Sequence, residues 1–371
     1  MISLEQRSSE LALNNDSPVV GIHHIELWVG NALQASHYFR TALGFTLIGV
    51  AGPRTGCMDR VSYLMRQGSL YVILSSGLRS KSPITDWVAV HGDGVRDVAL
   101  LVQSTEQTWR DAIAWGAKSI DDPQIERYDG SRCNRGVITA FGDTVHTLIS
   151  EDDGKDKWFG AFERIESPNH LTSIVSALDH VAIAVEFGGM EKLARFYEDV
   201  FTMSVTHRED ISTLHSGMRS QVLESNGWPV RFTIVEPVEG KRTSQVQEFV
   251  QYHSCAGVQH IALLTPDIFA TTDAMKATGV EFLSPPQQYY NQIGQRLAES
   301  PFDDQALRQV GVMLDKDEWG YLLQVFSKPI HSRPTLFVEL IQREGARGFG
   351  RGNIRALFEA IELEMATRNN V

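Results

Sequence analysis

The two halves of the chain repeat one another, and this repeat limits the possible folds more than any other feature of the sequence. Residues 21–29 (GIHHIELWV) reappear as residues 177–185 (ALDHVAIAV), and both have the β-branched, roughly alternating pattern of a strand. Residues 93–101 (DGVRDVALL) match residues 256–264 (AGVQHIALL) still more closely. Residues 143–150 and 335–342 form a third pair that closes each half. The sequence therefore predicts two halves built on corresponding strands.

Apolar residues at helical spacing follow the first two strands of each half. Residues 32–43 and 190–201 come after the first strand, and residues 105–115 and 268–278 come after the second. Each half thus contains two units of one strand, one helix and further strands. Such units predict an α+β fold in which each half curls a mixed sheet around a pocket, with its helices outside.

The ends of the two halves show where the chain can be divided. Residues 151–176 are charged and rich in turn-forming residues, as expected of a linker or a surface excursion. Because 371 residues suit two domains, we place one domain at residues 1–155 and the second at residues 156–371. Near the end, a Gly-rich segment (348–353) leads into a predicted helix with Asn353 as its N-cap. The segment is compatible with a hinge for a helical lid and with a plain surface turn.

The composition excludes several classes of function. A net charge of −12 without a Lys/Arg block disfavours nucleic-acid binding, and the apolar runs are too short for a membrane span. The first residues lack the pattern of a secretory signal, so we expect a cytoplasmic protein. Only 3 cysteines occur, without a CxxC pair, which favours His and carboxylate ligands for any metal. We expect a small-molecule enzyme, and the sequence leaves its oligomeric state open, a homo-oligomer included.

Aligning the halves brings out one set of metal-type residues. The aligned pairs are His24 with His180, Asp97 with His260, and Thr147 with Glu339. Only the second half offers two histidines and a carboxylate, each on its own strand. This ligand set leaves open positions on the ion, as a non-haem Fe(II) oxygenase requires, although catalytic zinc accepts the same ligands. We interpret six further histidines as packed or hydrogen-bonded side chains and not as ligands. They are His23, His24, His146, His215, His253 and His331.

Several longer motifs resemble those of the 4-hydroxyphenylpyruvate dioxygenases and their close relative 4-hydroxymandelate synthase. The motifs are HGDGV (91–95), FGD (141–143), VHTL (145–148), LDH (178–180), GVQH (257–260), GYLLQVF (320–326), PTLFVE (334–339) and GFGRGN (348–353). The resemblance covers nearly the whole chain. It implies tandem βαβββ modules of the vicinal-oxygen-chelate type, a C-terminal lid helix, and Fe(II) held by His180, His260 and Glu339. It also implies an aromatic 2-oxo acid and O₂ as substrates.

The resemblance further implies a set of residues in or behind the substrate pocket. They are Ser220, Thr233, Gln245, Gln259, Gln324, Phe326, Phe337, Asn353 and Phe358. Two positions depart from the dioxygenase pattern, with Val235 in place of Asn and Ile354 in place of Phe. Simple core variation would explain both changes. Because Thr233, Val235 and Ile354 look more like the synthase, we expect 4-hydroxymandelate as the product and Val235 and Ile354 to determine it.

Three alternatives remain open on the sequence alone. The nearest is a 4-hydroxyphenylpyruvate dioxygenase that forms homogentisate. An extradiol catechol dioxygenase shares the module type and the ligand set, but it is not expected to carry the GFGRGN segment or the pocket glutamines. A non-catalytic small-molecule binding protein of the same module type would not need the ligand triad.

Overall fold

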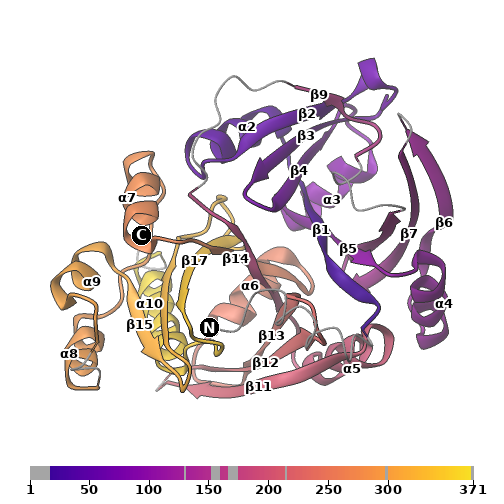
Figure 1. Ribbon diagram of the computed structural model, residues 1–371. Helices are drawn as coiled ribbons and strands as arrows, with labels where there is room; N and C mark the ends of the chain where they lie inside the picture. The colour runs from indigo at the N-terminus through magenta and orange to yellow at the C-terminus, as the bar shows by residue number, and fades with distance from the viewer. Residues whose placement is uncertain are drawn as a thin grey trace, which may run out of the picture.

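The computed structural model describes residues 17–128, 131–151, 159–165, 174–213, 215–296 and 300–368. Within these ranges the chain forms two large mixed sheets, one from each half (Figure 1). The predicted domain boundary between residues 155 and 156 falls outside the described residues and stays a prediction. The short strand β9 (Glu163–Arg164), which follows that boundary, pairs with the sheet of the first half.

The first half contains two βαβββ modules whose first strands pair antiparallel. Its sheet has the strand order β6-β7-β8-β5-β1-β4-β3-β2-β9, with β1 and β5 at the centre. The elements before β9 are β1 (Val19–Trp28), α2 (Ala32–Thr41), β2 (Thr46–Ala51), the 3-10 turn η1 (Pro53–Thr55), β3 (Arg60–Gln67), β4 (Leu70–Gly77), α3 (Pro83–His91), β5 (Gly94–Val102), α4 (Thr105–Trp115), β6 (Ser119–Tyr128), β7 (Ser131–Phe141) and β8 (Thr144–Glu151).

The second half repeats this arrangement in the order β11-β12-β13-β10-β14-β17-β16-β15. Its elements are β10 (Ala177–Ala184), α5 (Met190–Phe201), β11 (Met203–Ser212), β12 (Gly217–Ser225), β13 (Arg231–Val238), α6 (Gln245–His253), β14 (Gly257–Leu264), α7 (Ile268–Ala277), α8 (Gln287–Arg296), α9 (Asp304–Val310), β15 (Met313–Lys316), β16 (Tyr321–Phe326), β17 (Phe337–Glu344) and α10 (Arg351–Arg368).

The prediction of tandem βαβββ modules is confirmed, and the register of the strands shows how closely the halves correspond. In each half the first strand of a module pairs parallel with the last, as β1 does with β4 and β10 with β13. At the centre of the sheets, His24 pairs with Ala99 and His180 pairs with Ala262. Equivalent positions of the two sheets therefore carry the residues that the alignment set opposite one another.

The C-terminal helix α10 begins earlier than the sequence predicts. It starts at Arg351, so Asn353 lies in its first turn and the prediction of Asn353 as the N-cap is wrong. The carboxylate of Asp315 on β15 accepts a hydrogen bond from the backbone N–H of Gly352 (2.8 Å), and it satisfies the helix terminus in place of a local cap. The Asn353 side chain is thereby left to make contacts inside the protein.

The interior is continuous across the chain, and the helices lie outside the sheets as predicted. Residues of both halves belong to one large apolar cluster, to which α5 contributes the fully buried rings of Tyr197 and Phe201. α10 packs against β15 and α6 (Figure 1). Among the described helices, none is long and apolar enough to cross a membrane.

Candidate metal centre and substrate pocket

Three adjacent strands of the second sheet bring His180, His260 and Glu339 together. β10 pairs antiparallel with β14, and β14 pairs parallel with β17, so that Ala262 lies opposite Glu339. Side chains alternate between the two faces of a strand, and this register places all three on the same face. In this register the small side chain of Ala262 lies between His180 and Glu339 and leaves room for an ion.

The distances within this group suit a single cation. The Oε2 atom of Glu339 lies 3.3 Å from Nε2 of His180 and 3.5 Å from Nε2 of His260. The ligand atoms of all three residues lie within 4.8 Å of one another, and the residues are only 1 to 7% exposed. A metal with bonds of about 2.0–2.2 Å to nitrogen and oxygen can contact three atoms at this spacing. The donor set therefore fits a divalent ion.

The electrostatics of the group favour a positive charge. Burial alone raises the pKa of the Glu339 carboxyl, but the charges and hydrogen bonds of the two histidines outweigh it and bring the pKa to about 2. Burial lowers the pKa of His180, yet Glu339 and the neighbouring Asp179 together raise it to about 9. The two carboxylates thus create a buried position in which a cation is stabilised.

The corresponding strands of the first half carry a hydrogen-bonded pair instead of ligands. The backbone N–H of Thr147 donates to Asp97 (2.9 Å), and the Thr147 hydroxyl donates to the same carboxylate. Burial raises the pKa of Asp97 to about 6. Asp97 and Thr147 occupy the positions that His260 and Glu339 hold in the second half, which explains why the repeat contains one such ligand triad.

A cavity opens directly onto the three ligand residues, and its lining of apolar side chains with a few polar groups is typical of small-molecule sites. Its walls come from the strands β10 to β14, β16 and β17, from the start of α6, and from residues 349–357, which lead into and begin α10. The lining residues are His180, His207, Glu209, Met218, Ser220, Val222, Thr233, Val235, Gln245, Gln259, His260, Gln324, Phe326, Glu339, Phe349, Gly350, Ile354 and Leu357.

Comparisons with known proteins agree with this site. The model of the Glyoxalase/Bleomycin resistance protein/Dioxygenase superfamily matches residues 177–325. The 4-hydroxyphenylpyruvate dioxygenase of Neurospora crassa is 37% identical over 387 aligned residues, which cover 95% of this chain and 93% of the relative. The enzyme of the same name from Dictyostelium discoideum is 33% identical, with 95% and 100% covered. The chain belongs to the 4-hydroxyphenylpyruvate dioxygenase family.

A solved structure supports the same conclusion. A mutant of 4-hydroxymandelate synthase from Streptomyces coelicolor is 33% identical and superposes with a TM-score of 0.87, covering 94% of this chain and 99% of that one. The 4-hydroxyphenylpyruvate dioxygenase family therefore includes this chain by sequence and by fold. The predicted class of enzyme, a metal-dependent non-haem 2-oxo acid oxygenase, is confirmed at the level of the family.

Most of the pocket residues that the sequence singled out do line the cavity. They are Ser220, Thr233, Gln245, Gln259, Gln324, Phe326, Val235 and Ile354. Thr233 Oγ1 is buried and has no hydrogen-bond partner among the described residues. Buried hydroxyls are usually hydrogen-bonded, so this one is available to bond to a ligand. Whether these side chains bind substrate stays a prediction.

Three of the expected pocket residues lie behind the wall instead. Phe337 stacks on His260, with ring centroids 4.8 Å apart and planes at 24°. Phe358 is fully buried in an apolar cluster with Val235 and Phe249. Asn353 is also fully buried, and its Nδ2 donates to Oε1 of Gln324 (2.8 Å). These residues can support the pocket without touching its contents.

The hydrogen bonds behind Glu339 involve a tyrosine that the sequence did not indicate. Gln324 Nε2 donates to Glu339 Oε1 (2.8 Å), Asn353 donates to Gln324, and the Tyr289 hydroxyl donates to Asn353 Oδ1 (2.5 Å). The same hydroxyl accepts from the backbone N–H of Leu314 (2.8 Å). A buried chain of this kind fixes the orientation of the carboxylate at its end.

Tyr289→Phe is expected to lower the free energy of unfolding by about 1–3 kcal/mol, because it leaves Asn353 Oδ1 and the Leu314 N–H buried without their partner. Chemical denaturation of both proteins measures the change. Tyr290→Phe is the matched control, since the Tyr290 hydroxyl is buried without a hydrogen-bond partner among the described residues. An equal loss in both variants would show that the chain of hydrogen bonds contributes no stability of its own.

The Nδ1 atom of His180, on the side of the ring away from Glu339, contacts the ion pair of Asp179 and Arg343. This atom lies 2.9 Å from Asp179 Oδ1, and Arg343 donates to both oxygens of Asp179 (2.6 and 2.8 Å). Arg343 also donates to the carbonyl oxygen of Gly348 (2.7 Å), in the segment before α10. Contacts of this kind orient a ligating histidine and raise its basicity. The ion pair also ties the C-terminal segment to the metal centre.

Arg343→Met is expected to weaken metal binding by about 10- to 100-fold, the usual effect of losing a partner behind a metal ligand. Equilibrium dialysis against Fe(II) without oxygen, followed by elemental analysis, measures the affinity. Arg347→Met serves as the control, because Arg347 lies over the ring of Trp319, which is 49% exposed, away from the cavity. Unchanged affinity in Arg343→Met would mean that Asp179 orients His180 without help.

Proposed function

We propose that the chain is an Fe(II)-dependent oxygenase that converts 4-hydroxyphenylpyruvate and O₂ to 4-hydroxymandelate and CO₂. His180, His260 and Glu339 would hold the iron, which would supply the binding and reduction of O₂. The carboxylate of the substrate leaves as CO₂, one oxygen atom of O₂ becomes part of the new carboxylate at the former keto carbon, and the other oxygen atom is inserted into a benzylic C–H bond as a hydroxyl group. Which carbon of the substrate is oxidised depends on how the side chains of the pocket hold the aromatic ring.

The pocket offers neutral groups that can orient such a substrate. The hydroxyls of Ser220 and Thr233 and the amides of Gln245 and Gln259 can donate to a carboxylate or to a phenol without adding charge. Phe326 supplies an aromatic wall near His260, with ring centroids 6.2 Å apart. The cavity is largely apolar elsewhere, so a bound ring would displace water from the reacting carbons.

The proposal that 4-hydroxymandelate is the product rests on one observation. Val235 and Ile354 both line the cavity and pack in the same apolar cluster, so they form one continuous part of its wall. A branched Ile where the dioxygenase pattern has a flat Phe changes the surface against which the ring lies. Because misplacement by about 1 Å can cost on the order of 100-fold in rate, this wall can decide whether the benzylic carbon or the ring is oxidised.

The second candidate is formation of homogentisate, which the names of the relatives at 33 to 37% identity favour. To separate the two, Fe(II)-loaded protein is incubated in air with 4-hydroxyphenylpyruvate, and the product is resolved chromatographically against standards of both acids. We expect 4-hydroxymandelate with O₂ consumed in equal amount. Homogentisate as the sole product would overturn the first choice, and no O₂ uptake would overturn both.

A further inference from the structure

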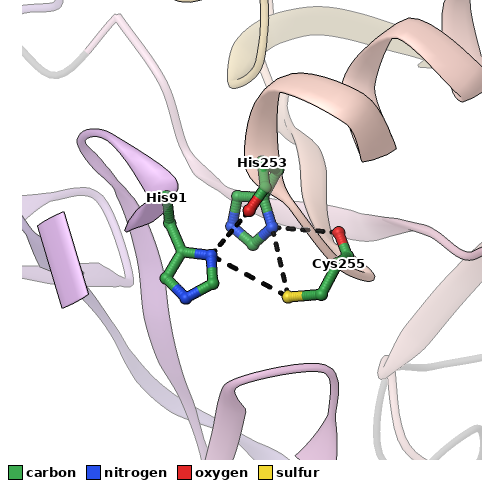
Figure 2. A group of neighbouring side chains, drawn as sticks. All are labelled: His91, His253 and Cys255. Carbon is green, nitrogen blue, oxygen red and sulfur yellow. Dashed lines mark hydrogen bonds between the residues drawn. The ribbon is translucent and has the colours of Figure 1, made fainter. Parts of the chain in front are cut away.

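A second group of metal-type side chains lies where the two halves meet, away from the cavity. Helix α3 of the first half ends at His91, helix α6 of the second half ends at His253, and Cys255 follows two residues later. Figure 2 shows the two imidazole rings and the thiol turned toward one another. Both histidines are only 2% exposed, and their ring centroids are 4.7 Å apart.

The distances between the donor atoms suit one small ion. The Sγ atom of Cys255 lies 3.9 Å from Nδ1 of His91 and 3.7 Å from Nδ1 of His253. A tetrahedral zinc ion, with bonds of about 2.0 Å to nitrogen and 2.3 Å to sulfur, holds such atoms roughly 3.5 Å apart. The two sulfur–nitrogen distances therefore exceed those of a zinc site by only a few tenths of an ångström, and all three donor atoms lie within 4.8 Å of one another.

The surroundings of His91 contain more hydrogen-bond acceptors than its neutral ring can satisfy. Nδ1 lies 2.6 Å from the carbonyl oxygen of His253, and Nε2 lies 3.0 Å from Oδ2 of Asp143. A neutral imidazole carries one N–H and can donate to only one of them. With a cation on Nδ1 and the hydrogen on Nε2, His91 would donate to Asp143, which is the usual carboxylate–histidine–metal arrangement.

Backbone carbonyl groups can complete the coordination. The carbonyl oxygen of Cys255 lies 3.0 Å from Nδ1 of His253, and the carbonyl oxygen of His253 faces His91. Figure 2 shows the oxygen of Cys255 joined by a dashed line to the His253 ring, and the oxygen of His253 joined to the His91 ring. Two imidazoles, one sulfur and one carbonyl oxygen make four donors, the number that a structural zinc site uses.

We propose that His91, His253 and Cys255 bind one borderline divalent cation of the zinc class, and that this cation clamps helix α3 to helix α6. Binding releases the proton of the Cys255 thiol, because the thiolate is the ligand. The site is distinct from the triad of the cavity and contains the one sulfur donor of the two groups.

The proposed cation site adjoins two elements that line the cavity, the helix α6 and the strand β14. Phe249 stacks on His253, with centroids 5.1 Å apart and planes at 16°, and it packs in the same apolar cluster as Val235. Gln245, at the start of α6, lines the cavity itself. Strand β14, which carries His260, begins two residues after Cys255. A cation at the clamp would therefore fix the position of one wall of the pocket.

Cobalt(II), which replaces zinc in tetrahedral sites, provides the test. A thiolate bound to Co(II) gives an intense charge-transfer band in the near ultraviolet, whereas His180, His260 and Glu339 offer no sulfur. Titration of the full-length protein with Co(II) is expected to produce this band, to saturate it with one sulfur-bound ion per chain, and to lose it when Zn(II) is added. Cys255→Ser should abolish the band, and His91→Gln should weaken Co(II) binding at least tenfold.

The matched controls are Cys57→Ser and Cys133→Ser, which should both keep the band of the unmodified protein. No band in the unmodified protein at millimolar Co(II) would overturn the proposal without any variant. A band that survives Cys255→Ser, or that disappears in Cys133→Ser, would overturn it as well. Circular dichroism shows whether each variant is folded, and His253→Gln provides the second ligand variant if Cys255→Ser is not.

Discussion

Replacing Glu339 by glutamine is expected to abolish turnover and to weaken Fe(II) binding by more than about 100-fold, which exceeds the usual loss from partners behind a ligand. The amide keeps the size of the side chain and can still accept the hydrogen bond from Gln324. It removes the buried negative charge that the two histidines and a divalent ion require. Iron content after anaerobic dialysis and O₂ uptake with substrate measure the two effects.

Glu344→Gln is the matched control, because Glu344 ends the same strand β17 on its exposed part. It should keep the iron content and the O₂ uptake of the unmodified protein. Full iron content and full turnover in Glu339→Gln would rule out Glu339 as a ligand. Loss of both in Glu344→Gln as well would point to damage of the strand rather than of the metal centre.

The double substitution Val235→Asn with Ile354→Phe is expected to shift the product from 4-hydroxymandelate to homogentisate by at least tenfold, which corresponds to about 1.4 kcal/mol between two barriers. A flat ring at position 354 would turn the substrate ring toward the metal. Asparagine at position 235 would place a polar group in a wall that is now apolar. Chromatography of the products under equal conditions gives the ratio.

Leu357→Met is the control for this experiment, since Leu357 lines the same cavity and the exchange nearly conserves volume. Its product ratio should stay that of the unmodified protein. If the double variant keeps the original ratio while it still turns over, Val235 and Ile354 do not determine the product. If Leu357→Met shifts the ratio equally, the general packing of the pocket decides it.

The repeat made the modular fold and the convergence of the triad predictable. Strand pairing fixes the register, so residues at equivalent positions of β10, β14 and β17 must meet on one face of the sheet. The comparison of the halves also implied that Asp97 and Thr147 stand where the second half has ligands, but it did not predict that these two residues bond to one another.

The supporting contacts were not predictable, because they come from a segment without a counterpart in the first half or join residues that lie far apart in the chain. Tyr289 lies on α8, between α7 and β15, where the first half has only a short connection. Arg343 reaches Asp179 across 164 positions of the chain. His207 and Phe349 also line the cavity, and no local sequence pattern indicated this for either residue.

The error at Asn353 has a related cause. Asparagine before an apolar helical pattern is a good local N-cap, but Asp315 of β15 satisfies the helix terminus from a distance, and Asn353 instead bonds to Gln324 and Tyr289. Phe358 follows the apolar spacing of its helix correctly, yet it points into the core behind Val235. Spacing predicts the apolar face of a helix but not which of its residues reach a cavity.

Ring-deuterated 4-hydroxyphenylpyruvate tests the central claim most directly. The substrate carries four ring deuterium atoms, and oxidation at the benzylic carbon leaves all four in place. Homogentisate keeps three, because its ring carries an additional substituent. Mass spectrometry of the product from the Fe(II)-loaded protein is expected to show all four deuterium atoms, with none of this product from Glu339→Gln. A product that has lost one ring deuterium would contradict the account.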